Sequence, residues 1–207
     1  MTDRNAIEVF ADIWCPFAYV GLRMIRNYRN KVGATDTAIT VRSWPLELVN
    51  SAPMDPVKAK GNCDALREQV APDAFACVNV DNFPTSTLDA LTLIAHAYSV
   101  DIDRGENATF RVREALFEEG RDISDHTVLD DLAREIGVSD YGDPTHAAVH
   151  ADWQEGKKRG VIGSPHFFYG TVGTFCPSLQ MTREPATGLT IHTDASRLQE
   201  FLEQCFI

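Results

Sequence analysis

The order of hydrophobic and polar positions predicts strands near both ends of the chain and helices between them. Residues 7–13 (IEVFADI) alternate partly and are rich in β-branched and aromatic side chains, which is typical of a strand. Residues 16–33 repeat apolar side chains at helical spacing and begin with Pro16, a residue favoured at the first helical position. Residues 39–44 alternate again. These segments predict a βαβ unit, which favours a parallel strand pair with a right-handed crossover.

Beyond this unit the pattern is mostly helical. Residues 45–83 are rich in proline and predict only short helices or loops. Residues 86–89 (STLD) fit a capping box that opens a helix, whose apolar stripe continues to residue 98. Three more helical stripes follow, at residues 106–118, 127–136 and 145–158. Gly137 and Gly160 are expected to end the last two of them.

Strand signals return only near the end of the chain. Residues 166–169 (HFFY) and 174–176 predict two short strands, and residues 170–173 predict a tight turn that joins them into an antiparallel hairpin. Residues 194–206 predict a closing amphipathic helix. Its expected inward side chains are Leu198, Phe201, Leu202 and Cys205. The predicted order is therefore β-α-β, helices, β-β-α.

Composition and charge narrow the possible partners. The 207 residues carry a formal net charge of -11, which repels phosphate backbones and anionic lipid heads. Residues 1–10 are polar and acidic where a secretory peptide has a basic and then an apolar region, and no apolar run is long enough to span a membrane. We therefore expect a cytoplasmic protein without a nucleic-acid or membrane partner. The five cysteines are an odd number and are sparse, which argues against a disulfide scaffold.

One of these cysteines, Cys15, lies where the first predicted strand gives way to the first helix. The unpaired N–H groups of a first helical turn and the positive end of the helix dipole face such a position. Both favour the thiolate, which is the nucleophilic form of cysteine, so the position predicts a lowered pKa and a reactive thiol. The alternative is that Cys15 is a small buried apolar residue that ends a strand.

Three segments carry a resemblance to a known family: residues 12–21 (DIWCPFAYVG), 116–125 (LFEEGRDISD) and 160–167 (GVIGSPHF). They resemble the active-site segment, a stretch of the helical insertion and the cis-proline loop of the DsbA-like branch of thioredoxin-fold proteins, and of its FrnE group in particular. The resemblance implies an α/β thioredoxin fold of order βαβ…ββα that is interrupted by a helical insertion domain. Residues 1–48 and 155–207 would form the thioredoxin-like domain, and residues 49–154 would form the insertion.

The same resemblance assigns roles to five residues. It implies that Cys15 is the catalytic thiol, that Pro165 is cis and that the Pro165 loop packs beside Cys15. The Ser164 backbone would then offer N–H and C=O groups to an extended substrate or a thiol, with Pro16 and Phe17 completing this binding surface. The alternative for Pro165 is a trans peptide bond at the start of an edge strand.

The chain departs from the family pattern at Ala18, where the dithiol members of the family have their second cysteine. Disulfide exchange needs only one thiolate, but a mixed disulfide on Cys15 must then be released by another thiol. Three explanations stay open: a small thiol such as glutathione or mycothiol releases it, another cysteine releases it, or Ala18 is a substitution made to trap an intermediate. Cys176 is the best internal candidate for a resolving thiol; its alternative role is a buried strand cysteine before Pro177.

The resemblance implies a thiol–disulfide oxidoreductase that acts on a disulfide-bearing protein or a small thiol adduct, without a tightly bound cofactor. A second hypothesis is a thiol-cofactor-dependent transferase or isomerase. Kappa-class glutathione transferases and 2-hydroxychromene-2-carboxylate isomerases are related to this family, and residues 176–180 stand in the region of their thiol clamp. Those enzymes commonly have Ser where Cys15 lies, which weakens this hypothesis. A third hypothesis is a catalytically silent binding module.

The other chemically active side chains have structural alternatives. Cys63 and Cys77 lack the short spacing of a zinc site, and His146 and His150 lack a third ligand, so we expect no metal. His166 either tunes the thiolate or is an ordinary strand side chain. Three aromatic residues form an apolar rim around Cys15 or pack in the core: Trp14, Phe17 and Tyr19.

Overall fold

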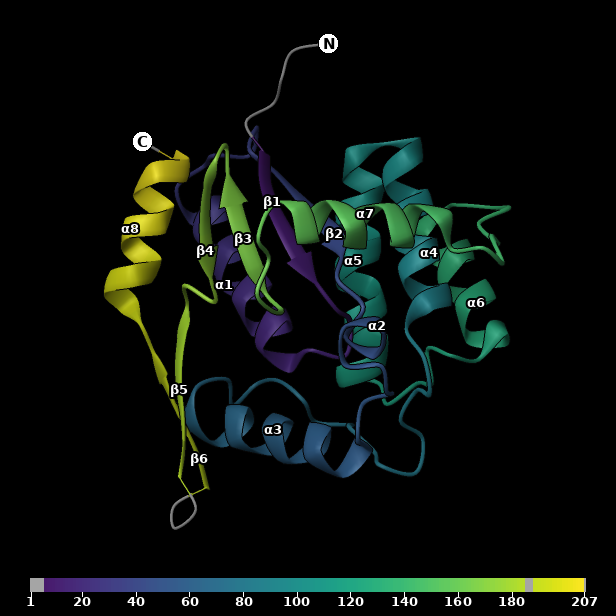
Figure 1. Cartoon of the computed structure of the whole chain (residues 1–207), viewed down its shortest axis with the longest axis horizontal. Helices are drawn as coiled ribbons and strands as arrows, with labels where there is room; N and C mark the ends of the chain where they lie inside the picture. Colours follow the sequence, from purple (N-terminus) through teal and green to yellow (C-terminus); the bar gives the residue numbers. More distant parts are fainter. Residues whose placement is uncertain (1–5, 185–187, 207) are drawn as a thin grey trace.

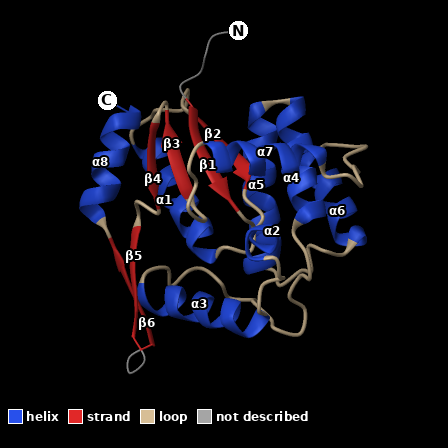
Figure 2. Ribbon diagram, viewed as in Figure 1, coloured by secondary structure: helices blue, strands red, loops and turns tan. Residues whose placement is uncertain are grey.

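Four strands form the central sheet of the molecule, in the order β2-β1-β3-β4 (Figures 1 and 2). The computed structural model describes residues 6–184 and 188–206. Residues 1–5, 185–187 and 207 lie outside the described part, including half of the polar amino-terminal stretch considered above. The strands are β1 (Ala6–Ala11), β2 (Ala38–Ser43), β3 (His166–Tyr169) and β4 (Val172–Phe175). β1 pairs in parallel with β2 and antiparallel with β3, and β3 pairs antiparallel with β4.

The predicted βαβ unit is confirmed. Helix α1 (Pro16–Lys31) starts directly after Cys15, with Pro16 in its first turn, and returns the chain to β2. Val9 lies beside Val41 in the parallel register of β1 and β2. The carboxyl end of β1 and the amino end of α1 therefore meet at one end of the sheet, and Cys15 lies between them.

Each face of the sheet is covered by helices. On one face, strand residues such as Ile7, Val9 and Phe167 share a hydrophobic cluster with α1 and with α8 (Ala195–Phe206). On the other face, Phe10 and Trp44 meet α7 (Ala147–Lys158). This second contact is close because α7 has a glycine there: a Cβ on Gly156 would lie 2.7 Å from the Trp44 ring.

The chain between β2 and α7 is helical. It contains α2 (Leu46–Asn50), α3 (Pro56–Gln69), α4 (Leu88–Val100), α5 (Ile102–Phe117) and α6 (His126–Ile136). Figure 1 shows α3 running across the molecule below the carboxyl end of β1, while α4, α5 and α6 gather beside the sheet. The domain boundaries implied by the resemblance, 1–48, 49–154 and 155–207, stay a prediction.

The length of α3 and the cap of α4 differ from the expectations. Helix α3 is longer than the short pieces expected, because Asp55 accepts N–H bonds from Val57 and Lys58 and caps it. The capping box at residues 86–89 is wrong. Thr87 is the N-cap of α4 and makes no side-chain cap bond; its N–H instead donates to the Glu47 carboxylate, at 2.8 Å. The Ser86 hydroxyl still accepts the Leu88 N–H at 3.2 Å, so Glu47 of α2 takes the place only of Asp89 in the expected capping box.

The sequence also missed a second hairpin. Strands β5 (Leu179–Glu184) and β6 (Gly188–Thr193) form a separate two-stranded sheet. Their apolar residues do alternate with polar ones, Leu179 and Met181 in β5 and Leu189 and Ile191 in β6, but each strand has only these two apolar positions and most of its other residues are exposed, which makes the signal weak. The observed order is therefore β-α-β, helices, β-β, β-β, α. The first hairpin is confirmed, although β4 begins at Val172, two residues earlier than expected.

Helix α8 is confirmed at the end of the described chain. Three of its four expected inward residues are buried, namely Phe201, Leu202 and Cys205, and Leu198 is half-buried. Among the helices of residues 6–184 and 188–206, none has the length and apolar character required to cross a membrane.

Candidate active site at Cys15

The turn between β1 and α1 holds Cys15 at the N-cap of the helix. Its backbone is extended, and its carbonyl accepts the N–H groups of Ala18 and Tyr19 at 3.1 and 3.2 Å. The side chain is only 4% exposed and lies in the hydrophobic cluster between the sheet, α1 and α8. The structure therefore places Cys15 where the sequence predicts it, and covers it.

The loop before β3 reaches this turn from the other end of the chain. Sγ of Cys15 donates a hydrogen bond to the Ser164 carbonyl at 3.0 Å. The Ser164 hydroxyl accepts the Asp12 N–H, also at 3.0 Å. The Ser164–Pro165 peptide bond is cis, and the Pro165 carbonyl accepts the Cys176 N–H at 3.0 Å. The turn and the loop, about 150 residues apart, thus form one hydrogen-bonded unit.

The predicted lowering of the Cys15 pKa is wrong for this arrangement. Burial raises the pKa of the Cys15 thiol above its ordinary value, because a thiolate loses its hydration in an apolar environment. Contacts with Ser164 and with the N–H groups of the first helical turn lower the pKa but do not outweigh burial. The negative charge of Asp12 raises it further. A helix amino terminus is visible in the sequence, but the degree of burial is not.

Two buried charged residues belong to the same hydrogen-bonded unit as Cys15, and the sequence alone gave neither of them a role. Asp12 and Arg113 are both fully buried. Burial raises the pKa of Asp12 to about 6 and lowers that of Arg113 to about 10. Arg113 lies on α5 among buried residues such as Val112 and Leu116, and a charged residue within an apolar stripe is the signal that could have revealed it.

Of the three aromatic residues expected around the thiol, two are buried in the core and one is partly exposed. Trp14 stacks on Phe83 and Tyr19 stacks on Phe117, and both Trp14 and Tyr19 are buried, so they pack in the core. Phe17 is only half-buried and is the aromatic residue left for a rim.

The remaining binding residues lie on the turn and the loop. Pro16 and Pro165 are buried, whereas Ser164 is half-buried. Ile162, just before this part of the loop, is 74% exposed and is a large apolar side chain that the sequence analysis did not consider. Of the residues predicted to bind a substrate, Phe17 and Ser164 therefore keep some exposed surface, and Ile162 adds an exposed apolar side chain on the same loop as Ser164.

The other cysteines are also free thiols. Cys176 is 1% exposed and takes a left-handed backbone conformation with φ of 43°. Burial raises the pKa of Cys176 to about 12, and the charge of Cys15 contributes to this shift. Burial likewise raises the pKa of Cys63 on α3, with a smaller contribution from Cys15. Cys77, by contrast, is exposed.

The contacts of His166 are those of a strand side chain, which is one of the two roles that the sequence left open. Its ring stacks on Phe168 with the centroids 4.7 Å apart and the planes 6° apart. Its Nδ1 accepts the Ile162 N–H at 3.3 Å. Burial lowers the pKa of His166, and the positive charge of Arg159 lowers it further. The described contacts of His166 are with the strand and loop around it.

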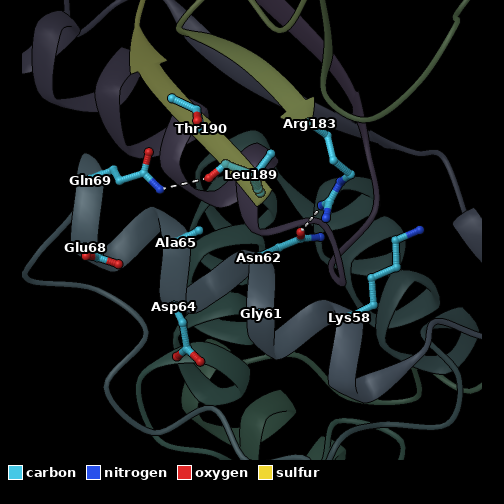
Figure 3. A pocket seen from close by; sticks show the side chains of 10 residues that line it. All are labelled: Lys58, Gly61, Asn62, Asp64, Ala65, Glu68, Gln69, Arg183, Leu189 and Thr190. Atoms are coloured by element: carbon cyan, nitrogen blue, oxygen red, sulfur yellow. Dashed lines mark hydrogen bonds between the residues drawn. The ribbon is translucent and has the colours of Figure 1, made fainter. Parts of the chain in front are cut away.

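A groove lies away from Cys15, between α3 and the β5–β6 hairpin (Figure 3). This groove of about 630 Å³ is lined by exposed charged and polar side chains such as Lys58, Glu68 and Arg183. Figure 3 shows Gln69 pointing to the Leu189 carbonyl and Arg183 pointing to Asn62. None of the predicted site residues lines it. Within residues 6–184 and 188–206, no group of three or more His, Cys, Asp or Glu side chains is placed to hold a metal.

Comparisons with known proteins agree with the fold. Residues 6–183 match the family model of the DSBA-like thioredoxin domain. YwbO from Bacillus subtilis (strain 168), a protein described as uncharacterized, is 25% identical over 135 residues. This match covers 64% of the chain and 66% of YwbO, so it spans just under two thirds of that relative.

Three solved structures share the fold at 14% sequence identity. A candidate protein disulfide isomerase from Nitrosomonas europaea has a TM-score of 0.67, with 97% of each chain covered. The cytosolic disulfide reductase DsbM from Pseudomonas aeruginosa has a TM-score of 0.62, with 96% of this chain and 97% of DsbM covered, and a structure of DsbM with GSH also matches. A 2-hydroxychromene-2-carboxylate isomerase has a TM-score of 0.58, with 82% of this chain and 88% of that chain covered.

Proposed function

The chain belongs to the DSBA-like thioredoxin family, and from this premise we propose that it is a thiol–disulfide oxidoreductase whose catalytic thiol is Cys15. The observation that carries the proposal is the 3.0 Å contact between Cys15 Sγ and the Ser164 carbonyl. This contact joins a nucleophile at a helix amino terminus to a half-buried loop backbone that offers polar groups to a substrate. A cysteine that served only as apolar filling would need no such partner.

The chemistry requires two exchange steps. In the first, the Cys15 thiolate attacks one sulfur of a substrate disulfide, forms a mixed disulfide and releases the other sulfur as a thiolate. Because the fourth residue of the Cys-Pro-Phe-Ala motif is Ala18, the motif has no second thiol that could release the mixed disulfide. In the second step, a small thiolate attacks the substrate sulfur of the adduct, forms a disulfide with it and releases Cys15 as a thiolate. An internal cysteine would instead attack the Cys15 sulfur, release the substrate thiolate and leave an internal disulfide on Cys15, which a small thiol must then reduce. We assign the second step to a low-molecular-weight thiol, glutathione or mycothiol, with Cys176 as the internal candidate.

The first step also requires an opening around Cys15. Because Cys15 is only 4% exposed, little of it is open to a substrate sulfur. A local displacement at the half-buried Phe17 or at the Ser164–Pro165 loop would expose it. Once hydrated, the thiolate loses the penalty of burial and keeps the N–H groups and dipole of α1, which favour its ionisation.

The surface next to Cys15 suits an extended peptide or a small thiol. Phe17 and Ile162 offer apolar contacts, and the Ser164 backbone offers polar ones. The proposed partners are therefore a disulfide-bearing protein or a small thiol adduct. The buried Pro16 and Pro165 would support this surface. The DsbM structure with GSH favours glutathione as the small thiol, and the cytosolic location in the name of DsbM favours a cytoplasmic location for this chain.

The test is exchange with a model disulfide in the presence of glutathione. We expect Cys15→Ser to lower the exchange rate by more than about a hundredfold, because the nucleophile is lost. The matched control is Cys77→Ser, which removes an exposed thiol outside the site and should leave the rate unchanged. Full activity in Cys15→Ser would overturn the proposal.

The same assay separates the other candidates. If a small thiol resolves the adduct, turnover rises with glutathione concentration in Cys176→Ala as in the unchanged protein. If Cys176 resolves it, Cys176→Ala accumulates the mixed disulfide. Saturable glutathione or mycothiol binding without exchange would instead support the transferase or isomerase hypothesis.

A further inference from the structure

A buried pair of opposite charges lies between the Cys15 turn and the helical segment. Asp12 follows β1 and Arg113 lies on α5, about 100 residues later, and neither side chain is exposed to solvent. Burying an arginine costs a large desolvation penalty unless hydrogen bonds and an opposite charge compensate it. The hydrogen bonds of Arg113 and the charge of Asp12 therefore have to offset this penalty.

Arg113 is only partly satisfied. One terminal nitrogen donates to the Thr109 carbonyl at 2.9 Å, and the other donates to the Asp12 carbonyl at 3.3 Å. Its Nε is buried and has no hydrogen-bond partner among the residues that the structure describes. A purely structural side chain at this position would be expected to satisfy all its donors, or to be apolar.

The backbone of Asp12 connects this guanidinium to the thiol through hydrogen bonds, and its carboxylate acts on both through its charge. Its carboxylate accepts the Trp14 N–H at 3.1 Å and also accepts the Leu46 N–H. Its own N–H donates to the Ser164 hydroxyl, and the Ser164 carbonyl accepts the hydrogen bond from Cys15. Arg113, Asp12, Ser164 and Cys15 therefore form a continuous chain of contacts.

The charges around the thiol come from several elements. Asp12 after β1 is negative and opposes the ionisation of Cys15. Arg113 on α5 is positive and interacts electrostatically with both Asp12 and Cys15. Tyr98 on α4 and Tyr19 on α1 also face Arg113, and burial raises the pKa of each, so both are neutral near pH 7. A Cys15 thiolate and an ionised Asp12 would be two buried negative charges. The positive charge of Arg113 reduces the net charge of the three groups from -2 to -1.

We propose that Arg113 is a positioning residue for the reaction of Cys15: its guanidinium compensates the Asp12 carboxylate, and Asp12 is the group through which pH acts on the thiol. This inference deepens the proposed function and rests on it for the need of a Cys15 thiolate. It makes a helix of the inserted segment part of the control of the thiol.

The direction of the pH effect follows from Asp12. Because burial raises the pKa of Asp12 to about 6, Asp12 is a carboxylate above that pH and is neutral below it. The carboxylate repels the thiolate and the neutral acid does not. Removing the Asp12 charge should therefore lower the pKa of Cys15, whereas removing the Arg113 charge should raise it.

The test measures the rate of carbamidomethylation of Cys15 by iodoacetamide between pH 5 and 10, with the modified Cys15 peptide quantified by mass spectrometry. We expect Arg113→Met to lower the rate at pH 7 about tenfold, which corresponds to about one pKa unit. Arg113→Lys, which keeps the charge, should recover most of the rate. Asp12→Asn should raise the rate, and the double variant Asp12→Asn with Arg113→Met should return it toward the original value.

The controls separate charge from damage to the fold. Arg111→Met removes a charge from the outer side of the same helix, where Arg111 pairs with Glu119 and Glu135, and should leave the pH profile unchanged. If Arg113→Met does not fold, the double variant still decides the question, because it leaves neither a carboxylate nor a guanidinium buried without its opposite charge. Its rate compared with that of Asp12→Asn then isolates the effect of Arg113. An unchanged rate in Asp12→Asn, or equal losses in Arg113→Met and Arg113→Lys, would overturn the inference.

The readout is also independent of the proposed function. If the charge variants shift the Cys15 profile as expected but Cys15→Ser keeps full exchange activity, the proposed function is wrong and the charge coupling stands. If exchange depends on Cys15 but the pH profile of Cys15 modification is the same in the Asp12 and Arg113 variants, the coupling is wrong and the proposed function stands.

Discussion

The turn at Cys15 and the groove between α3 and the β5–β6 hairpin differ in how they treat polar groups. The groove encloses about 630 Å³, and its charged residues are exposed to solvent. The turn has a buried thiol, a buried carboxylate and a buried guanidinium within one network of hydrogen bonds. Buried charges are costly and therefore mark places where a fold maintains a specific arrangement. The volume of a hollow is thus a poorer guide to the chemistry here than the polar groups that the core contains.

The largest expected difference between the two regions is in stability. Arg113→Met leaves the Asp12 carboxylate buried without its opposite charge, so we expect a loss of about 3 to 5 kcal/mol in the free energy of unfolding. Arg183→Met in the groove removes an arginine of the same size from an exposed position, and its effect should lie within about 0.5 kcal/mol. Urea unfolding at pH 7 measures both. Equal effects would remove the contrast between the regions.

A smaller effect should appear as a dependence of stability on pH. Because burial raises the pKa of Asp12 from 3.8 to about 6, the folded protein holds a proton on Asp12 at pH values where the unfolded chain has lost it. The stabilisation from this proton is fully present below pH 3.8 and is lost as the pH rises through 6. Relative to Asp12→Asn, the unchanged protein should therefore lose about 2 to 3 kcal/mol of stability between pH 4 and 7.

The control for this effect has the opposite sign. Asp73 is exposed, and its hydrogen bond to Arg23 lowers its pKa. Its contribution is present above the unfolded pKa and is lost as the pH falls, and it is small because solvent screens the pair. If Asp73→Asn and Asp12→Asn gave the same pH dependence, burial would not be its cause.

Much of the fold could be predicted because its signals are local. Pro16 at the start of an apolar repeat fixed the expectation of a helix after Cys15, and the His-Phe-Phe-Tyr run predicted β3. The hairpin of β5 and β6 was missed because each strand alternates only two apolar residues with mostly exposed polar ones, which is a weak signal. The start of α4 near residue 88 was predicted, but its capping box was not formed, because the Thr87 N–H donates to Glu47, a residue distant in sequence.

The site divides in the same way. The Cys-Pro motif and the Ser-Pro loop are short patterns that a sequence displays directly. The raised pKa of Cys15 and the pairing of Asp12 with Arg113 depend on burial by segments about 100 residues away, and burial results from packing. An ionisable residue in a sequence gives its charge, but only the fold gives its solvation.

The most direct test of Cys15 as the exchanging thiol is to treat the Cys77→Ser variant, which lacks the exposed thiol, with oxidised glutathione and to map the adducts by mass spectrometry. The account predicts a glutathione adduct on Cys15, formed as one equivalent of reduced glutathione is released, and its complete removal by excess reduced glutathione. Modification of other cysteines while Cys15 stays a free thiol would contradict it.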